Sequence, residues 1–114
     1  MRLNFPVIAD PTRLVANKYD MIQMNGDVMK AGRSAFVIDS DKTVRLIMTY
    51  PESTGRNFHE VVRAIDSLKL TTDYGVATPA NWVGGQEVII LPTLSSQEAA
   101  ERFPRGWKLS LIHI

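Results

Sequence analysis

The chain has 114 residues and a mass of 12.8 kDa, and its 13 basic and 12 acidic side chains leave a formal net charge of +1. This length is typical of one domain, which buries about 65% of its unfolded surface without disulfides or metals. The 45% hydrophobic and 22% charged fractions exclude a disordered tail and a collagen-like fibre. Charges of both signs are interspersed, so we expect neither nucleic acid nor an anionic membrane as a partner.

The chain contains no cysteine, which excludes disulfides, thiolate nucleophiles and cysteine-ligated metals within these residues. Its histidines, His59 and His113, lie in different segments without a second histidine at metal-ligand spacing, so we expect no metal and no cofactor. The longest aliphatic runs, 35–38 and 88–91, are far shorter than the roughly 20 residues of a membrane span. We therefore expect no span and a cytoplasmic location.

The N-terminal segment predicts a short strand followed by a helix. The apolar run 5–9 ends at Asp10-Pro11, which is typical of a strand that enters a turn. Asp10 can cap a helix that begins at Pro11. Apolar residues then recur at helical spacing as far as a stop signal at Asn25-Gly26.

Residues 34–50 predict a β-hairpin. The first strand, 35–38, is continuously apolar, residues 39–42 have turn chemistry, and apolar side chains alternate along 44–50. These patterns predict two antiparallel strands.

The strand 35–38 has no polar face, and such a strand normally lies inside a sheet with a partner at each edge. The hairpin supplies only one partner. The other is residues 5–9, residues 86–91 or a segment absent from this chain, and the last alternative suggests truncation.

A long amphipathic helix follows the hairpin. Its apolar side chains recur at helical spacing over 58–68, and Asn57 and Glu60 have the spacing of a capping box. This is the helix that the sequence predicts most strongly.

The C-terminal part begins with a loop-rich stretch, 71–85, in which Thr, Pro and Gly are frequent. Residues 86–91 predict a strand. Ser95 and Glu98 then predict the start of a short helix, which Pro104 ends.

Five segments stand in order along the chain: FPVIADPTRLVANKYDMI (5–22), RSAFVID (33–39), YPESTGRNFHEVVRAIDSLKL (50–70), VATPANW (76–82) and FPRGW (103–107). Together they resemble the 1-Cys peroxiredoxins, in the type 6-like branch rather than the 2-Cys enzymes. The resemblance implies an α/β fold class, with the C-terminal half of a thioredoxin-like fold (a strand hairpin plus a long helix) and then the peroxiredoxin C-terminal dimerisation region.

The resemblance and the change of texture near residue 72 divide the chain into three parts. Residues 1–72 are the C-terminal part of the thioredoxin-like domain, and 73–108 are the peroxiredoxin C-terminal region. The last six residues, 109–114, depart from the polar and basic extension of the family and match a translated transposase-type sequencing adapter. We expect them to be non-native, and a real terminal strand is the alternative.

The resemblance also implies an activity. In the family, a cysteine thiolate within a Pro-x-x-x-Thr-x-x-Cys motif attacks the peroxide O–O bond and becomes a sulfenic acid, which an external thiol reduces. This chain lacks the motif, so we interpret it as an inactive C-terminal fragment. Its parent is then a homodimeric antioxidant enzyme that reduces hydrogen peroxide and organic hydroperoxides with a thiol reductant.

Two active-site positions of the family have counterparts here. Arg33 resembles the arginine that lies against the thiolate and hydrogen-bonds the peroxide, and Arg56 resembles a second arginine that supports the pocket. A guanidinium lowers the pKa of a neighbouring thiol and presents fixed donors to a developing oxyanion. Taken alone, Arg33 is more often a surface ion-pair residue, and residues 54–57 are more often a helix cap or an anion-binding helix start.

A second hypothesis is a stand-alone non-enzymatic module, which dimerises through its C-terminal region or binds an anion through Arg33 and Arg56. His59 lies beside the apolar stripe of its helix, and we expect it to face solvent. Trp82 and Trp107 are expected to pack the C-terminal region, with an interface role as the alternative.

Overall fold

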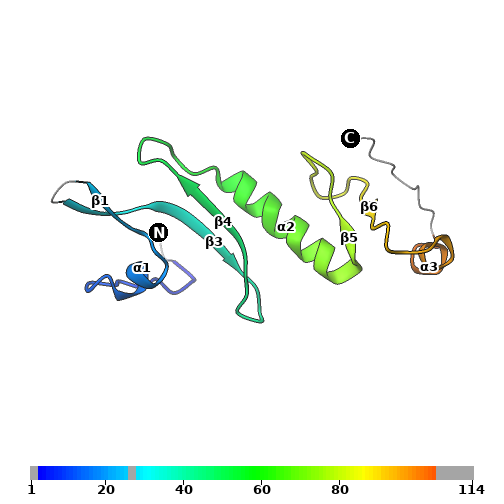
Figure 1. The fold of residues 1–114 in the computed structure, drawn as a ribbon, viewed down its shortest axis with the longest axis horizontal. Coiled ribbons are helices and arrows are strands. Elements are labelled where there is room, and N and C mark those ends of the chain that lie inside the picture. The colour runs from blue at the N-terminus through cyan, green and yellow to red at the C-terminus, as the bar shows by residue number, and fades with distance from the viewer. Residues whose placement is uncertain (1–2, 26–27, 105–114) are drawn as a thin grey trace. The chain divides into compact units, whose positions relative to one another are not determined.

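The computed structural model describes residues 3–25 and 28–104 (Figure 1). The chain divides into two compact units, with Arg56 ending the first and Asn57 beginning the second. In chain order the elements are α1 (Leu14–Lys18), β1 (Ile22–Asn25), β2 (Val28–Ala31), β3 (Arg33–Ile38), β4 (Val44–Tyr50), α2 (Phe58–Tyr74), β5 (Val76–Ala77), β6 (Ile89–Ile90) and α3 (Ser96–Arg102). Among the described residues the strands form three antiparallel pairs, β1–β2, β3–β4 and β5–β6.

Residues 5–9 form no strand, so this prediction is wrong. Their side chains are exposed, and that of Ile8 is 71% exposed. Pro6 has no N–H to donate to a neighbouring strand, and the run lacks the paired partner that would bury its apolar residues. An apolar run alone therefore did not define a strand here.

The helix predicted from Pro11 is reduced to the single short helix α1, which starts at Leu14. Asp10 stabilises its start, because its carboxylate oxygens accept the N–H groups of Val15 and Ala16 at 3.0 and 2.9 Å. The pKa of Asp10 lies below its ordinary value of 3.8 because of these bonds. The bond from the Ala16 N–H has the largest effect, followed by the bond from the Val15 N–H. Asp10 binds the first turn as expected, but the residue at the N-cap position is Arg13 and the helix is short.

The end of the predicted helix is instead strand β1, which pairs with β2 so that Asn25 lies opposite Val28. The prediction of a continuous helix to Asn25 is therefore wrong. Asn-Gly is both a helix stop signal and the strongest short-range hairpin signal, and the predicted helix relied on the first meaning.

The predicted β3–β4 hairpin is confirmed. Its register runs from Arg33 opposite Tyr50 to Ile38 opposite Val44, with an irregularity between Val37 and Ile38. Burial alternates along most of β4. The side chains of Leu46, Met48 and Tyr50 are half-buried, whereas that of Val44 is exposed.

Asp39 organises the turn between β3 and β4. One of its carboxylate oxygens accepts the N–H groups of Asp41 and Thr43 at 3.0 and 2.9 Å, and the other accepts Arg45 Nη1 at 3.2 Å. The Thr43 bond is the main reason that the pKa of Asp39 lies below its ordinary value of 3.8. The turn chemistry expected for residues 39–42 is thus present.

The second edge of β3 has no strand partner within the described ranges. Residues 5–9 form no strand, and β6 pairs with β5, so neither of these two expected partners is correct. The ring of Tyr19 packs edge-on against Phe36 of β3, with centroids 5.0 Å apart and planes at 73°. A partner outside this chain stays a prediction.

The second unit begins with the predicted long helix α2. Asn57 caps it, because its side-chain oxygen accepts the N–H of Glu60 at 3.2 Å. The helix continues to Tyr74, into the stretch predicted as loop, and ends where Gly75 adopts a left-handed conformation with φ of 63°. Glycine adopts this conformation at little steric cost, so it suits the end of the helix.

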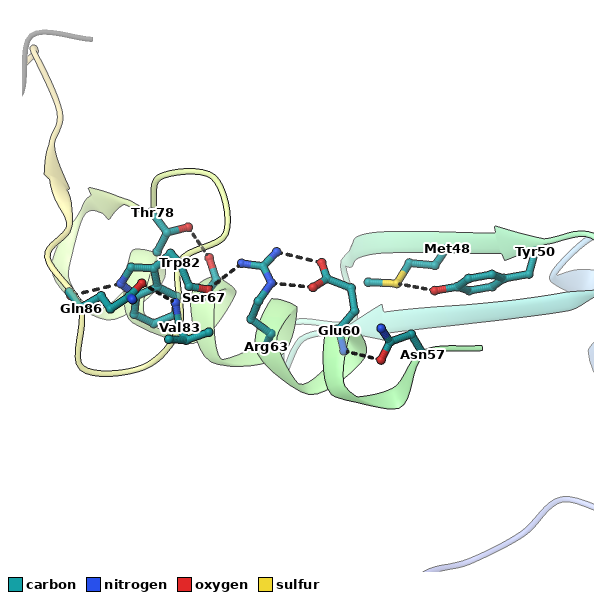
Figure 2. Close-up of polar contacts among 10 residues, drawn as sticks. All are labelled: Met48, Tyr50, Asn57, Glu60, Arg63, Ser67, Thr78, Trp82, Val83 and Gln86. Carbon is teal, nitrogen blue, oxygen red and sulfur yellow. Dashed lines mark hydrogen bonds and ion pairs between the residues drawn. The ribbon is translucent and has the colours of Figure 1, made fainter. Parts of the chain in front are cut away.

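Arg63 of α2 connects the helix to the loop that follows β5 (Figure 2). Its Nε and Nη2 donate to the two carboxylate oxygens of Glu60 at 2.6 and 2.8 Å, and its Nη1 donates to the carbonyl oxygen of Trp82 at 3.0 Å. The hydrogen bonds from Arg63 are the main reason that the pKa of Glu60 lies below its ordinary value of 4.5. The Arg63 guanidinium thereby ties the backbone of the loop at Trp82 to helix α2.

The buried side chains of the described residues all belong to this second unit: Ala64, Val76, Trp82 and Ala99. Trp82 is only 3% exposed, and its indole N–H donates to the carbonyl oxygen of Gln86 at 3.1 Å. The hydroxyls of Ser67 and Thr78 are hydrogen-bonded at 2.6 Å between α2 and the segment after β5. The expectation that Trp82 packs the C-terminal region is confirmed.

The last elements are β5, β6 and α3. The strand predicted over 86–91 is only β6, and its partner β5 lies in the stretch predicted as loop. The short helix α3 is confirmed with a complete capping box: the Glu98 N–H donates to Ser95 Oγ at 3.3 Å, and Glu98 accepts the Ser95 N–H at 2.9 Å. The helix ends before Pro104 as predicted. The predicted tail, 109–114, lies outside the described residues.

Trp82→Ala is expected to lower the free energy of unfolding by about 3–5 kcal/mol, because it removes the largest of the buried side chains in the part of the second unit that the structure describes. Trp82→Phe keeps an aromatic ring but loses the hydrogen bond to Gln86, so its loss is smaller. Denaturant unfolding followed by circular dichroism measures both. The neighbouring Val83, whose side chain is exposed, supplies the control: Val83→Ala should change stability by no more than about 0.5 kcal/mol. Equal losses at both positions contradict the prediction.

Candidate functional site

The two arginines singled out in the sequence belong to the same end of the β3–β4 hairpin. Arg33 is the first residue of β3 and lies opposite Tyr50, the last residue of β4. Arg56 lies in the connection that leaves Tyr50 for α2. Both arginines are exposed, and the Asp39 turn is at the opposite end of the hairpin.

Side-chain hydrogen bonds hold this end of the hairpin together. The hydroxyls of Ser34 and Thr49, which face each other across the strands, are 3.0 Å apart. The hydroxyl of Tyr50 donates to the sulfur of Met48 at 3.7 Å (Figure 2). The Ser34–Thr49 bond crosses the two strands and supports the register that places Arg33 opposite Tyr50, whereas the Tyr50–Met48 bond lies within β4.

The connection that contains Arg56 is ordered by backbone hydrogen bonds. The N–H of Thr54 donates to the carbonyl oxygen of Pro51 at 2.9 Å and closes a turn at the end of β4. Directly after Arg56, the Asn57 side chain caps α2 through the Glu60 N–H. Arg56 thus lies between a closed turn and a capped helix start.

The start of α2 is a helix cap, as the simpler interpretation of residues 54–57 predicted. The Glu60 N–H, a donor that an anion at this helix start would need, is already bonded to Asn57. Glu60 also places a carboxylate in the first turn, and its pKa is lowered by the hydrogen bonds from Arg63. A bound anion would meet this negative charge, so the positive groups suited to an oxyanion are Arg33 and Arg56.

Arg33 places a positive charge at a strand end, and Arg56 places another in the connection between β4 and α2. Guanidinium groups in this role lower the pKa of a nearby thiol and stabilise negative charge that develops on oxygen. The 114-residue chain contains no cysteine to act as nucleophile. In the part of the chain that the structure describes, no group of three or more His, Asp or Glu residues is placed to hold a metal ion, and no helix is long and apolar enough to cross a membrane.

Sequence reasoning missed two local features. Arg63 was not singled out, although the Glu60 and Arg63 spacing of three residues is a signal for a helical ion pair. The Ser34 and Thr49 pair was also missed, because cross-strand hydroxyl pairs appear only once the register is known. The expectation for His59 is confirmed, since its side chain is exposed. Trp107 lies outside the described residues.

The described residues combine one long capped helix with short antiparallel strand pairs, and comparison with known proteins shows which family this arrangement resembles. Residues 67–106 match the family model described as the C-terminal domain of 1-Cys peroxiredoxin, and residues 1–47 match that of the AhpC/TSA family. A 1-Cys peroxiredoxin of Dictyostelium discoideum is 48% identical over 107 residues, which are 94% of this chain and 44% of that protein. A mitochondrial peroxiredoxin of Saccharomyces cerevisiae is 47% identical over 89% of this chain and 41% of that protein.

Solved structures agree with these matches. The structure of a yeast mitochondrial 1-Cys peroxiredoxin has a TM-score of 0.78 at 46% identity, over 90% of this chain and 51% of that chain. Peroxiredoxin 6 of Arenicola marina has a TM-score of 0.81 at 40% identity, over 91% of this chain and 49% of that chain. Over 90% or more of its length the chain is similar to these 1-Cys peroxiredoxins, and it spans about half the length of the relatives it matches.

The comparisons confirm the family resemblance and the predicted α/β fold class. The match to the C-terminal family model starts at residue 67, and along the chain the first compact unit ends at Arg56 and the second begins at Asn57. The domain boundary near residue 72 stays a prediction. The roles of Arg33 and Arg56 in a peroxidase pocket also stay predictions.

Asn57→Ala is expected to lower the free energy of unfolding by about 1 kcal/mol, because the first turn of α2 loses its side-chain cap. Asn57→Asp is the matched control, since aspartate also accepts the Glu60 N–H and caps helices about as well as asparagine. Thermal unfolding of the three proteins measures the difference. If the alanine and aspartate variants are equally stable, the cap does not stabilise this helix start.

Proposed function

We propose that the protein that includes this chain is a thiol-dependent peroxidase, and that its peroxidatic cysteine lies outside these 114 residues. The supporting observation is the similarity to 1-Cys peroxiredoxins in both sequence and structure, over about half of their length, in a chain without cysteine. The substrates proposed are hydrogen peroxide and organic hydroperoxides, and the function is antioxidant defence and redox homeostasis.

In this proposal, Arg33 and Arg56 supply the electrostatic part of the reaction. The thiolate attacks one peroxide oxygen, the O–O bond breaks, and the sulfur becomes a sulfenic acid. The other oxygen departs with the bonding electron pair and takes up a proton to become water or an alcohol. The two guanidiniums favour the thiolate before attack and the negative charge on the departing oxygen during it. Their shared position at one end of the hairpin supports this assignment.

The reductant and the location belong to the same proposal. We assign the reduction of the sulfenic acid to an external thiol, because the similar yeast mitochondrial enzyme is described as resolving its thiol via the glutathione/thioredoxin systems. We propose a homodimer and a cytoplasmic location. The yeast relative is described as mitochondrial, so cell fractionation is the measurement that decides the location here.

The proposal is tested first on the DNA and then on the protein. An in-frame Pro-x-x-x-Thr-x-x-Cys motif upstream of Met1 supports it, and a stop codon directly before Met1 without that motif contradicts it. The 114-residue chain mixed with peroxide and a thiol should show no turnover above the blank, because it contains no thiolate. The protein extended upstream should show turnover, and its Cys→Ser variant should lose it. Clear turnover by the chain alone contradicts the assignment.

In the extended protein, Arg33→Met and Arg56→Met are each expected to slow cysteine oxidation by peroxide. The loss should be about 10²-fold for Arg33, comparable to removal of one oxyanion donor, and smaller for the supporting Arg56. The pKa of the cysteine thiol should rise in both variants. Arg45→Met is the control, because Arg45 pairs with Asp39 at the other end of the hairpin. Stopped-flow oxidation and thiol alkylation against pH measure both effects, and an unchanged rate and thiol pKa in Arg33→Met overturn its role.

A further inference from the structure

The second unit contains a mostly apolar pocket of about 300 Å³ at the C-terminal end of α2. Three aromatic side chains line it, those of Tyr74, Trp82 and Phe103, and aliphatic side chains such as Leu70 and Val88 add to its apolar lining. Small-molecule sites have volumes of about 300–1,000 Å³ and combine apolar walls with a few polar groups that orient the ligand. The pocket therefore has the size for one compact ligand, such as a fused pair of rings with a short side chain.

The polar atoms inside the pocket already have partners. The indole N–H of Trp82 donates to the carbonyl oxygen of Gln86, and the side-chain oxygen of Gln86 accepts the N–H of Val83, both at 3.1 Å. A polar group in the interior would therefore find few partners, whereas an apolar group would leave these bonds intact. The interior favours an aromatic or aliphatic body.

A cation lies beside this apolar lining. The Nη1 atom of Arg102 is 3.5 Å from the position that a Cβ atom would take on Gly75. Gly75 separates two residues of the lining, Tyr74 and Val76, and Arg102 directly precedes a third, Phe103. Arg102 is also exposed, so a ligand that enters from solvent can reach its guanidinium.

The end of α2 gives a physical reason for a cation at this place. The last turn of α2 contains no basic residue, and the carbonyl groups at a helix C-terminus attract positive charge. Glu98, four residues before Arg102 on α3, also attracts the guanidinium, but its carboxylate already accepts the N–H and the hydroxyl of Ser95. A guanidinium has five N–H donors, so Arg102 can remain at the helix end and still bind a carboxylate.

We propose that this pocket binds a small aromatic carboxylate, with its rings against the aromatic lining and its carboxylate at Arg102. Aromatic rings pack favourably edge-on or offset against one another, and the planar guanidinium can donate to both oxygens of a carboxylate. An apolar interior next to a single accessible cation matches the two halves of such a ligand. The proposal concerns the second unit alone and is independent of the peroxidase proposal.

The test titrates two probes, naphthalene-2-acetate and its neutral amide, into the ¹⁵N-labelled whole protein, with any upstream segment that the DNA encodes. The probes have the same rings and nearly the same shape, so they differ mainly in charge. Both should shift the indole N–H resonance of Trp82, which is the one absent from Trp82→Phe. The acid should bind about fivefold more tightly than the amide, because an ion pair with an exposed arginine adds only modestly to affinity.

Four variants separate the charge from the pocket. Arg102→Gln should remove the preference for the acid and leave the affinity for the amide unchanged. Lys69→Gln loses the same charge at an exposed position of α2 outside the lining, so it is the matched control and should keep the preference. Val88→Phe adds volume to a pocket wall and should abolish binding of both probes. Val83→Phe, at an exposed position outside the lining, should preserve it.

Each other outcome rejects part of the assignment. Equal affinities for the two probes, or a preference that survives Arg102→Gln, overturn the proposal that Arg102 binds the carboxylate. An equal loss of preference in Lys69→Gln also overturns it, because net charge then attracts the acid. If neither probe shifts the Trp82 resonance, the pocket is not the site. If Val88→Phe unfolds the second unit, seen as a loss of dispersed amide resonances, the titrations of the unmutated protein and of Arg102→Gln decide alone.

Discussion

The hydrogen-bond ladder between β3 and β4 is the constraint on which the candidate site depends. It fixes Arg33 opposite Tyr50, and the connection that contains Arg56 departs from that residue. The ladder is fixed at both ends by side chains, through the Ser34 and Thr49 hydroxyls at one end and the Asp39 turn at the other. Yet β3 has a strand on only one edge within the described ranges, although its side chains are largely apolar. An apolar strand gains most when both edges and faces are covered, so this hairpin is best suited to the interior of a larger sheet.

Arg63 has a structural role in this chain, and its environment differs from that of Arg33, for which a chemical role is proposed. Arg63 donates to both oxygens of Glu60 and to a loop carbonyl, so its hydrogen-bonding capacity stabilises the second unit. The charge of Arg63 is balanced by a neighbouring carboxylate, and little of it is available to a ligand. Arg33 lies exposed at the end of a strand whose register is fixed, a position from which a guanidinium can reach a reacting group. The same residue type therefore packs a helix in one unit and offers positive charge in the other.

The sequence predicted the elements whose signals are local and unambiguous. The α2 and α3 helices have side-chain caps at their first turns, and the β3–β4 hairpin combines alternation with turn chemistry. The sequence analysis misassigned β1 as the end of a helix, because Asn-Gly signals both a helix stop and a hairpin turn. Only the pairing of β1 with β2 distinguishes the two. Strands β5 and β6 are two residues each, and such short pairs form because the chain brings them together after α2, which no local pattern reports. Arg33 and Arg56 were found through motif resemblance, since one exposed arginine looks much like another in composition and periodicity.

The proposed peroxidase implies a physical division of labour between the two arginines of this chain and a cysteine outside it. A guanidinium keeps its charge at every accessible pH, so the positive potential at this hairpin end exists whether or not a thiol is near. A thiol without that potential stays largely protonated at neutral pH and reacts slowly, and the potential without a thiol has nothing to activate. In the proposed peroxidase, the chemistry depends on packing a thiol-bearing segment from outside these 114 residues against this hairpin. Among the described residues one edge of β3 has no strand partner, so a contact that completes the sheet there would also complete the proposed site.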